Sequence, residues 1–167
     1  KILSSPQWKV GNSPIVENSV YDGEIYDARQ ENPGWSTPGF NDLEWENAIR
    51  VDVPENRQLK AQMMPPMRVT RTLRPVSMNE PVEGVYVFDF GQNMTGWPRL
   101  HVKGGQGTKV TMKTAEVTRS DMIRMKGKDP SMIEVDTIDP SPNRSAKARN
   151  IYYLKGSHKT ETYEPRF

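Results

Sequence analysis

Proline and glycine interrupt the chain along its whole length, and this feature most limits the fold. The 167 residues include 14 prolines and 12 glycines. Between them, no apolar pattern with the helical period survives for about twelve residues. Short runs that alternate apolar and polar side chains do survive. The sequence therefore predicts an all-β fold, an antiparallel β-sandwich with many turns and few or no helices.

Alternating side chains mark the expected strands, because a strand that buries one face has a period of two. The clearest hairpin is predicted around Gly104–Gly107, between strands over residues 97–103 and 108–117. "Asp22-Gly23" predicts a turn or bulge inside a strand over residues 19–29. The aromatic-rich stretch over residues 32–48 is expected to be a loop packed on the body. Further strands are expected at residues 7–10, 51–53, 67–76, 85–90, 132–138 and 151–156.

Composition argues against several classes of protein. The net charge of +2, from 23 basic and 21 acidic side chains, does not indicate nucleic-acid binding. No apolar run approaches the roughly 20 residues of a membrane-spanning helix, so no membrane partner is expected. Cysteine is absent, which excludes disulfides and thiolate chemistry.

Two acidic clusters could carry chemistry. Glycosidases use paired carboxylates, and Glu17, Asp22, Glu24 and Asp27 lie close in sequence. We favour the simpler interpretation, an exposed acidic strand end, and predict no catalytic residue. A second cluster, Asp42, Glu44 and Glu46, has oxygen ligands at alternating positions, as in some calcium loops. Its spacing does not fit an EF-hand, so we expect no metal, with calcium as the alternative.

The remaining candidates are histidines, tryptophans and a polar corner. Neither His101 nor His158 has a nearby Ser, Cys or Asp arrangement that suggests a nucleophile. Trp8, Trp35, Trp45 and Trp97 could stack on sugar rings or fasten loops to a sandwich, and the second role is the commoner. In the corner over residues 89–97, Gly91 and Gly96 are expected to allow positive φ or close backbone approach. Asp89 and Asn93 are expected to hydrogen-bond the corner's own backbone.

Several motifs together carry a family resemblance. "YDGEIYDAR", "DFGQNMTGW" and "ETYEPRF" occur in this order, with "AQMMPPMRVTRTLRPV" and "GTKVTMKTAEV" between them. The chain resembles the N-terminal, non-catalytic β-domain region of bacterial α-L-rhamnosidases of glycoside hydrolase family 78. The resemblance implies a jelly-roll or concanavalin-like sandwich. It also implies a multidomain enzyme whose catalytic carboxylates lie in an (α/α)6 barrel, where they act with inversion at the anomeric carbon.

The resemblance also predicts the domains and partners. Residues 1–54 would be the tail of the N-terminal β-domain, packed on the next, and residues 55–167 a β-sandwich incomplete at its C-terminal edge. A composition change near residues 54–59 places the boundary. The chain begins with Lys1 and reaches Phe167 inside the approach to a strand. We therefore expect a piece of a longer bacterial polypeptide, periplasmic or secreted rather than cytoplasmic, whose missing barrel is its main partner.

Three functions remain open from the sequence. The first is a non-catalytic part that braces the barrel of an enzyme releasing terminal α-L-rhamnose from glycans or glycosides. The second is a module that binds rhamnose-containing carbohydrate, with or without calcium. The third is a purely structural interaction domain. The residues predicted to contact carbohydrate are Trp35, Trp45, Gln92, Asn93 and Trp97.

Overall fold

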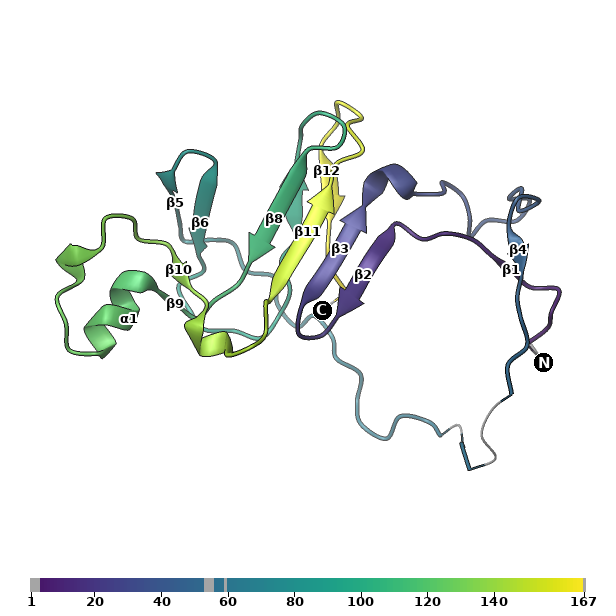
Figure 1. The fold of residues 1–167 in the computed structure, drawn as a ribbon, viewed down its shortest axis with the longest axis horizontal. Coiled ribbons are helices and arrows are strands. Elements are labelled where there is room, and N and C mark those ends of the chain that lie inside the picture. Colours follow the sequence, from purple (N-terminus) through teal and green to yellow (C-terminus); the bar gives the residue numbers. More distant parts are fainter. Residues whose placement is uncertain (1–3, 53–55, 59, 167) are drawn as a thin grey trace. The chain divides into compact units, whose positions relative to one another are not determined.

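The computed structural model describes residues 4–52, 56–58 and 60–166, which divide into two compact units. The first unit comprises residues 1–14 and 30–68, and the second comprises residues 15–29 and 69–167. Short strands alternate with long irregular connections (Figure 1). The boundary predicted between residues 54 and 55 stays a prediction, and it lies outside the described residues, as does the end of the strand predicted at 51–53.

The first unit is held by a short strand pair and by Trp45. Strand β1 (Lys9–Val10) pairs antiparallel with β4 (Glu46–Asn47). The Trp45 ring packs on Gly11, where an added Cβ atom would lie 2.3 Å from the ring. The ring also meets the Phe40 ring edge-on, with centroids 5.3 Å apart. Trp45 thus ties its loop to β1, as the aromatic content of that loop predicts.

The second unit is built on a four-stranded sheet in the order β2-β3-β11-β8. Strands β2 and β3 form a hairpin, β11 joins β3 in parallel, and β8 pairs antiparallel with β11. The parallel pair departs from the wholly antiparallel sandwich predicted, because a long crossover rather than a hairpin joins β3 to β11. The bounds are Ile15–Ser19 for β2, Gly23–Asp27 for β3, Lys109–Lys113 for β8 and Arg149–Tyr153 for β11.

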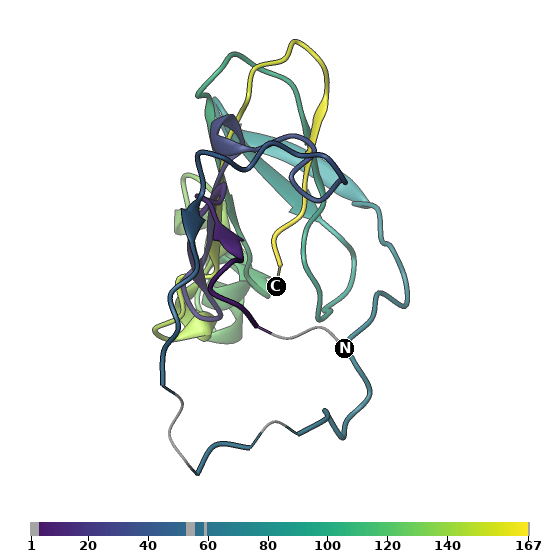
Figure 2. The same ribbon diagram turned by 90° about the vertical axis from the view of Figure 1, so that its right-hand side faces the viewer.

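A two-stranded sheet of β7 (Leu100–Val102) and β12 (Glu161–Tyr163) contributes to the other side of the core. The rings of Tyr152 in β11 and Tyr163 in β12 stack across the core with centroids 4.7 Å apart. Figure 2 shows the larger sheet edge-on and the yellow C-terminal segment as a separate layer. The predicted all-β sandwich is therefore confirmed. The core contains Ala28, Tyr152, Leu154 and Tyr163, with Tyr26, Leu100, Val102, Val110 and Met112 packed against them.

Smaller elements complete the described fold. A hairpin joins β5 (Ser77–Val82) to β6 (Val85–Asp89). Strands β9 and β10 pair beside α1, which has seven residues and is the one α-helix in the described part of the chain. The remaining bounds are Val117–Thr118 for β9, Arg119–Met125 for α1, Ile138–Asp139 for β10, Ala28–Gln30 for η1, Pro130–Met132 for η2 and Ser141–Asn143 for η3.

The predicted hairpin at Gly104–Gly107 is wrong. Strand β7 pairs with β12 and β8 pairs with β11, so the chain changes sheets at this turn. The turn instead docks on the end of β11. The Gly107 amide donates to the Leu154 carbonyl, and the Leu154 amide donates to the Thr108 carbonyl, each at 2.9 Å.

Two predicted strands are also wrong. Residues 67–76 are irregular and largely exposed, and β5 begins only at Ser77. Of this stretch, only the Val76 amide bonds to a described strand, at the Asp89 carbonyl of β6. Most of residues 132–138 are irregular, with β10 starting at Ile138. The strand expected at 85–90 is found as β6, one residue shorter, and the strand expected at 151–156 is found as β11, which starts two residues earlier and ends three residues earlier.

Gly156 supplies a direct test of this docked turn. It has φ +78°, and an added Cβ would lie 2.3 Å from the Gln106 backbone nitrogen. We expect Gly156→Ala to lower the free energy of unfolding by about 3 kcal/mol, measured by urea denaturation, because both strain and a backbone clash result.

Gly84 is the matched control, because it has φ +75° but no atom within 4 Å of an added Cβ. Gly84→Ala should cost only the conformational strain, about 1 kcal/mol. Equal losses in the two variants would contradict a packing role for Gly156.

Candidate functional site

Glu24 is the most deeply buried charged residue that the structure describes, with 0% exposure. Its Oε1 accepts a hydrogen bond from the Tyr163 hydroxyl at 2.9 Å. Its Oε2 accepts from Asn18 Nδ2 and from Arg166 Nη1, each at 3.2 Å. Its backbone amide donates to Asn150 Oδ1 at 2.8 Å. These donors compensate the lost hydration of the carboxylate, and they join β2, β3, β11 and the segment after β12.

Tyr163 is the protonated partner in this cluster. Burial raises the pKa of its phenol, and the hydrogen bond to Glu24 raises it further. Near neutral pH the hydroxyl is therefore protonated and donates to the carboxylate. The Tyr26 ring packs beside it, with ring centroids 5.5 Å apart.

Glu161 forms a second carboxylate cluster, at the turn between β11 and β12. Its Oε2 accepts from the Tyr152 hydroxyl at 2.8 Å and from the Lys155 amide at 2.9 Å, and its Oε1 accepts from the Gly156 amide at 2.8 Å. Burial acts to raise the pKa of Glu161. The donated hydrogen bonds outweigh burial and leave the pKa below its ordinary value. This carboxylate is a fixed anion that shapes the turn.

A third group of polar side chains lies on the outer side of β7 and β12. The Trp97 indole Nε1 donates to Glu164 Oε2 at 3.4 Å, and Arg99 Nε donates to Glu164 Oε1. His101 Nδ1 and Thr162 Oγ1, which lie opposite each other in the strand pair, are 2.9 Å apart. The hydrogen bond from Arg99 lowers the pKa of Glu164. We call these five side chains the β7–β12 outer face.

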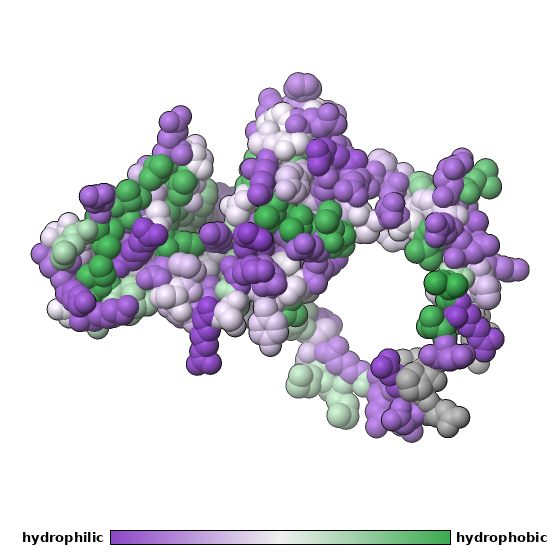
Figure 3. Space-filling view, in the orientation of Figure 1, coloured by the Kyte–Doolittle hydropathy of each residue, from purple (hydrophilic) through white to green (hydrophobic). Residues whose placement is uncertain are grey.

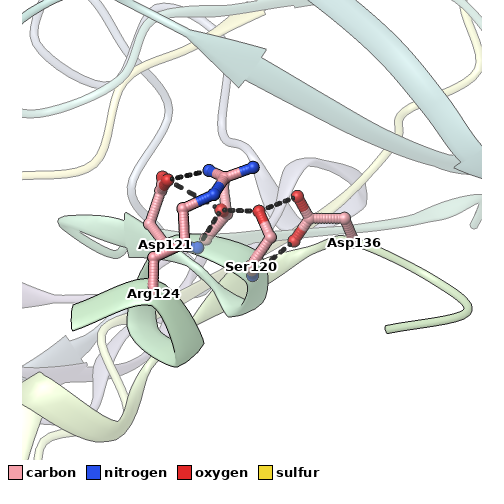
Figure 4. A network of polar contacts seen from close by, with 5 residues as sticks. Ser120, Asp121, Arg124 and Asp136 are labelled. Carbon is pink, nitrogen blue, oxygen red and sulfur yellow. Dashed lines mark hydrogen bonds and ion pairs between the residues drawn. The ribbon is translucent and has the colours of Figure 1, made fainter. Parts of the chain in front are cut away.

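Figure 4 shows a polar network at the start of α1. The Ser120 hydroxyl donates to Asp136 Oδ2 at 2.5 Å and its amide donates to Oδ1 at 3.0 Å. The Ser120 hydroxyl lowers the pKa of Asp136. Thr118 Oγ1 accepts from the Asp121 amide at 3.2 Å, and Arg124 pairs with Asp121 at 2.8 Å. No histidine of the described chain contacts Ser120, so the network caps the helix and does not activate a nucleophile.

The five predicted carbohydrate contacts are divided between the two units. Trp35 and Trp45 belong to the first unit, whereas Gln92, Asn93 and Trp97 belong to the second. Trp35 is 64% exposed and Trp97 is 38% exposed, while Trp45 is packed in its loop. Gln92 and Asn93 are exposed and make no hydrogen bond with any described residue. Carbohydrate binding by these residues stays a prediction.

The corner that contains Gln92 and Asn93 is predicted correctly only in part. Asp89 Oδ1 accepts from the Gly91 amide at 2.7 Å, and Gly91 has φ +70°, as expected. The expectation for Gly96 is wrong, because its φ is not positive and an added Cβ would meet no atom within 4 Å.

The predicted acidic strand end is partly wrong. Glu17 and Asp22 are exposed as expected, but Glu24 is buried because the C-terminal segment covers it. Asp27 is also buried, and it binds Arg29 at 2.7 Å. Each buried carboxylate is thus held by partners of its own.

Among the described residues, no three His, Cys, Asp or Glu side chains gather to hold a metal ion, and calcium stays an untested alternative. Within the same residues, no helix has the length and apolar character needed to cross a membrane.

The sequence analysis missed the partners supplied by the C-terminal stretch. Glu161, Glu164 and Arg166 contact residues 9, 67 and 142 positions away. The signal was the "ETYEPRF" motif itself, in which charged residues alternate with aromatic and small ones. The motif marks this stretch as one of the family's signatures, but it does not identify the distant residues that its side chains bind.

Two protein families match the chain. Residues 1–71 match the α-L-rhamnosidase N-terminal domain, and residues 79–167 match the bacterial α-L-rhamnosidase concanavalin-like domain. The α-L-rhamnosidase of Streptomyces avermitilis is 42% identical over 170 residues, which cover 100% of this chain and 15% of that protein. The chain therefore spans only a small part of the length of its curated relatives.

Solved structures of α-L-rhamnosidases have a similar fold over nearly the whole of this chain. The α-L-rhamnosidase from Dictyoglumus thermophilum superposes with a TM-score of 0.84 at 40% identity, covering 99% of this chain and 17% of that one. The Streptomyces avermitilis α-L-rhamnosidase complexed with L-rhamnose gives a TM-score of 0.82 at 41% identity, covering 99% of this chain and 15% of that one.

Replacement of Glu24 tests the first cluster. We expect Glu24→Gln to lower the free energy of unfolding by about 2–4 kcal/mol in urea denaturation, because a glutamine amide in this place cannot accept from all three donors. Glu17→Gln, on exposed β2, is the control and should change stability by less than about 0.5 kcal/mol. If Glu24→Gln left the free energy of unfolding unchanged, the cluster would not be a constraint on folding.

Acid titration tests the Glu161 cluster. Because the folded pKa of Glu161 lies below its ordinary value of 4.5, its contribution to stability is complete above pH 4.5. The contribution is lost as the pH falls through the folded pKa. The difference in unfolding free energy between the wild type and Glu161→Gln should therefore be constant near neutrality and shrink below pH 4.5. A difference that grows in acid would contradict the assignment.

Proposed function

Because the chain belongs to the bacterial α-L-rhamnosidase family, we propose that the polypeptide carrying it hydrolyses terminal α-L-rhamnose from glycans or glycosides. The chain itself is the family's non-catalytic N-terminal and concanavalin-like region. The match to both domain families is the observation that carries the proposal. The catalytic carboxylates would lie elsewhere in the same polypeptide, in keeping with relatives that are several times longer.

The chemistry of the described residues supports a non-catalytic role. A glycosidase needs one carboxyl group to protonate the leaving oxygen and another to attack or to activate water. Glu24 and Glu161 are both saturated by donors, and Asp27 is held by Arg29. These carboxylates shape the core and the turns.

An exposed apolar hairpin supports a bracing role. Register pairs Met78 with Phe88 across β5 and β6, and Tyr86 follows on the same side of β6. All three side chains are about half exposed. Figure 3 shows apolar, green surface at the end of the second unit that carries this hairpin. A two-stranded hairpin with an apolar face is marginally stable alone, and such a surface is usually covered in a complete protein. We propose that the catalytic part of the polypeptide covers it.

Carbohydrate binding is the second candidate function, favoured by the exposure of Trp35 and Trp97. In this case the region would hold rhamnose-containing glycan near the catalytic part, with calcium as an optional ligand. An enzyme acting on glycans would work in the periplasm or the medium, and we include that location in the proposal.

An activity assay tests the leading proposal. On an aryl α-L-rhamnoside, the longer polypeptide should release the aryl alcohol, whereas the 167-residue chain should match the buffer rate. An aryl β-D-glucoside is the matched control, on which neither protein should act.

Turnover by the 167-residue chain would overturn its non-catalytic role. Failure of the longer polypeptide on every α-L-rhamnoside would overturn the parent activity. For bracing, Phe88→Ser should lower the melting temperature of the longer polypeptide more than Tyr21→Ser, which alters an exposed turn residue.

A further inference from the structure

The β7–β12 outer face combines an aromatic ring with fixed polar groups. Leu100, Val102 and Tyr163 turn inward to the core, so the residues that alternate with them face outward. Trp97 is 38% exposed, and the Arg99 and Glu164 side chains are 52% and 36% exposed. The face is therefore open in this chain while its backbone is fixed by the core beneath it.

Glu164 holds two of these groups in place. One carboxylate oxygen accepts a hydrogen bond from Trp97 Nε1, and the other accepts a hydrogen bond from Arg99 Nε. Beside them, Thr162 fixes the His101 ring. Side chains restrained in this way lose little conformational entropy when a ligand binds, which favours weak but specific recognition.

The chemistry of these groups suits a sugar. The apolar C–H face of a sugar ring packs on an aromatic face, and L-rhamnose adds a methyl group at C5. The two Nη nitrogens of Arg99 have no partner among the described residues and can donate to hydroxyls. Arg99 lowers the pKa of Glu164, so the carboxylate stays charged and accepts from hydroxyls. A sugar hydroxyl can accept a hydrogen bond from Arg99 and donate one to Glu164.

We propose that the β7–β12 outer face binds the rhamnose-containing carbohydrate on which the longer polypeptide acts. The Trp97 ring packs on the sugar, and Arg99 and Glu164 hydrogen-bond its hydroxyls. The inference rests on the proposed function, because the parent activity supplies the class of sugar. It differs from the carbohydrate site predicted from the sequence, since it excludes Trp35 and Trp45 and adds Arg99, His101, Thr162 and Glu164.

A titration observed by NMR tests the proposal. The ¹⁵N-labelled 167-residue chain is titrated with methyl α-L-rhamnoside, and the indole Nε1–H signals are followed. We expect the Trp97 signal to shift with a dissociation constant of about 1–10 mM, typical of a single small ligand on an open face. The backbone amide signals of β7 and β12 give a second readout: Trp97→Ala should abolish their shifts, and Glu164→Gln should weaken binding at least about fivefold, by loss of a charged acceptor.

Trp35→Ala is the matched control, because it removes a more exposed indole from the other unit. It should leave the dissociation constant unchanged. Circular dichroism of each variant checks that it is folded. If Trp97→Ala is unfolded, the dissociation constant of Glu164→Gln and the shift of the wild-type Trp97 signal still test the proposal.

Three outcomes would overturn the proposal. The first is no shift of the Trp97 signal with about 50 mM glycoside. The second is binding that Trp35→Ala abolishes and Glu164→Gln leaves intact. The third is a response in the 167-residue chain that is lost in the longer polypeptide, which would mean that another domain covers the face. Each can occur while the longer polypeptide hydrolyses an aryl α-L-rhamnoside, so the failure is distinct from a failure of the proposed function.

Discussion

The buried carboxylate of Glu24 is the constraint on which the second unit depends. A charge without access to water must be met by donors, and here they come from Asn18, Tyr163 and Arg166. The β2–β3 hairpin and the C-terminal segment must therefore reach their places together. Because an incomplete set would leave a charge uncompensated, the cluster penalises alternative arrangements of the same strands.

The exposed apolar side chains support the proposal that further protein covers parts of this region. Few side chains of the described chain are fully buried, whereas the β5–β6 hairpin presents half-exposed Met78, Tyr86 and Phe88. A single domain of this length usually buries a larger core. The matched relatives are several times longer, which gives these surfaces ample protein to pack against. Stability of this region in the whole enzyme would then come in part from interdomain contacts.

Local patterns predicted strands well and their partners poorly. Period-two alternation predicted β8, and short apolar runs predicted β6 and β11, because a strand's own residues record its burial. It paired β7 with β8 wrongly, because Gly107 binds the distant Leu154. The T-x-x-D pattern at Thr118–Asp121 is a helix-cap signal, but charges and prolines around it obscured the short α1. At the candidate site, sequence indicated Trp97 but could not supply Glu164, since a partner 67 residues away leaves no local pattern.

The parallel pairing of β3 with β11 has a consequence for how this polypeptide is made. Glu24 and its partner Asn150 are separated by 126 positions. At synthesis rates of about 5–20 residues per second, roughly 6 to 25 s pass between their appearance. During this interval one edge of the β2–β3 hairpin has no neighbouring strand, and an open edge can pair with another nascent chain. Slow synthesis therefore lengthens the time in which this edge can pair with another chain, whatever the stability of the finished fold.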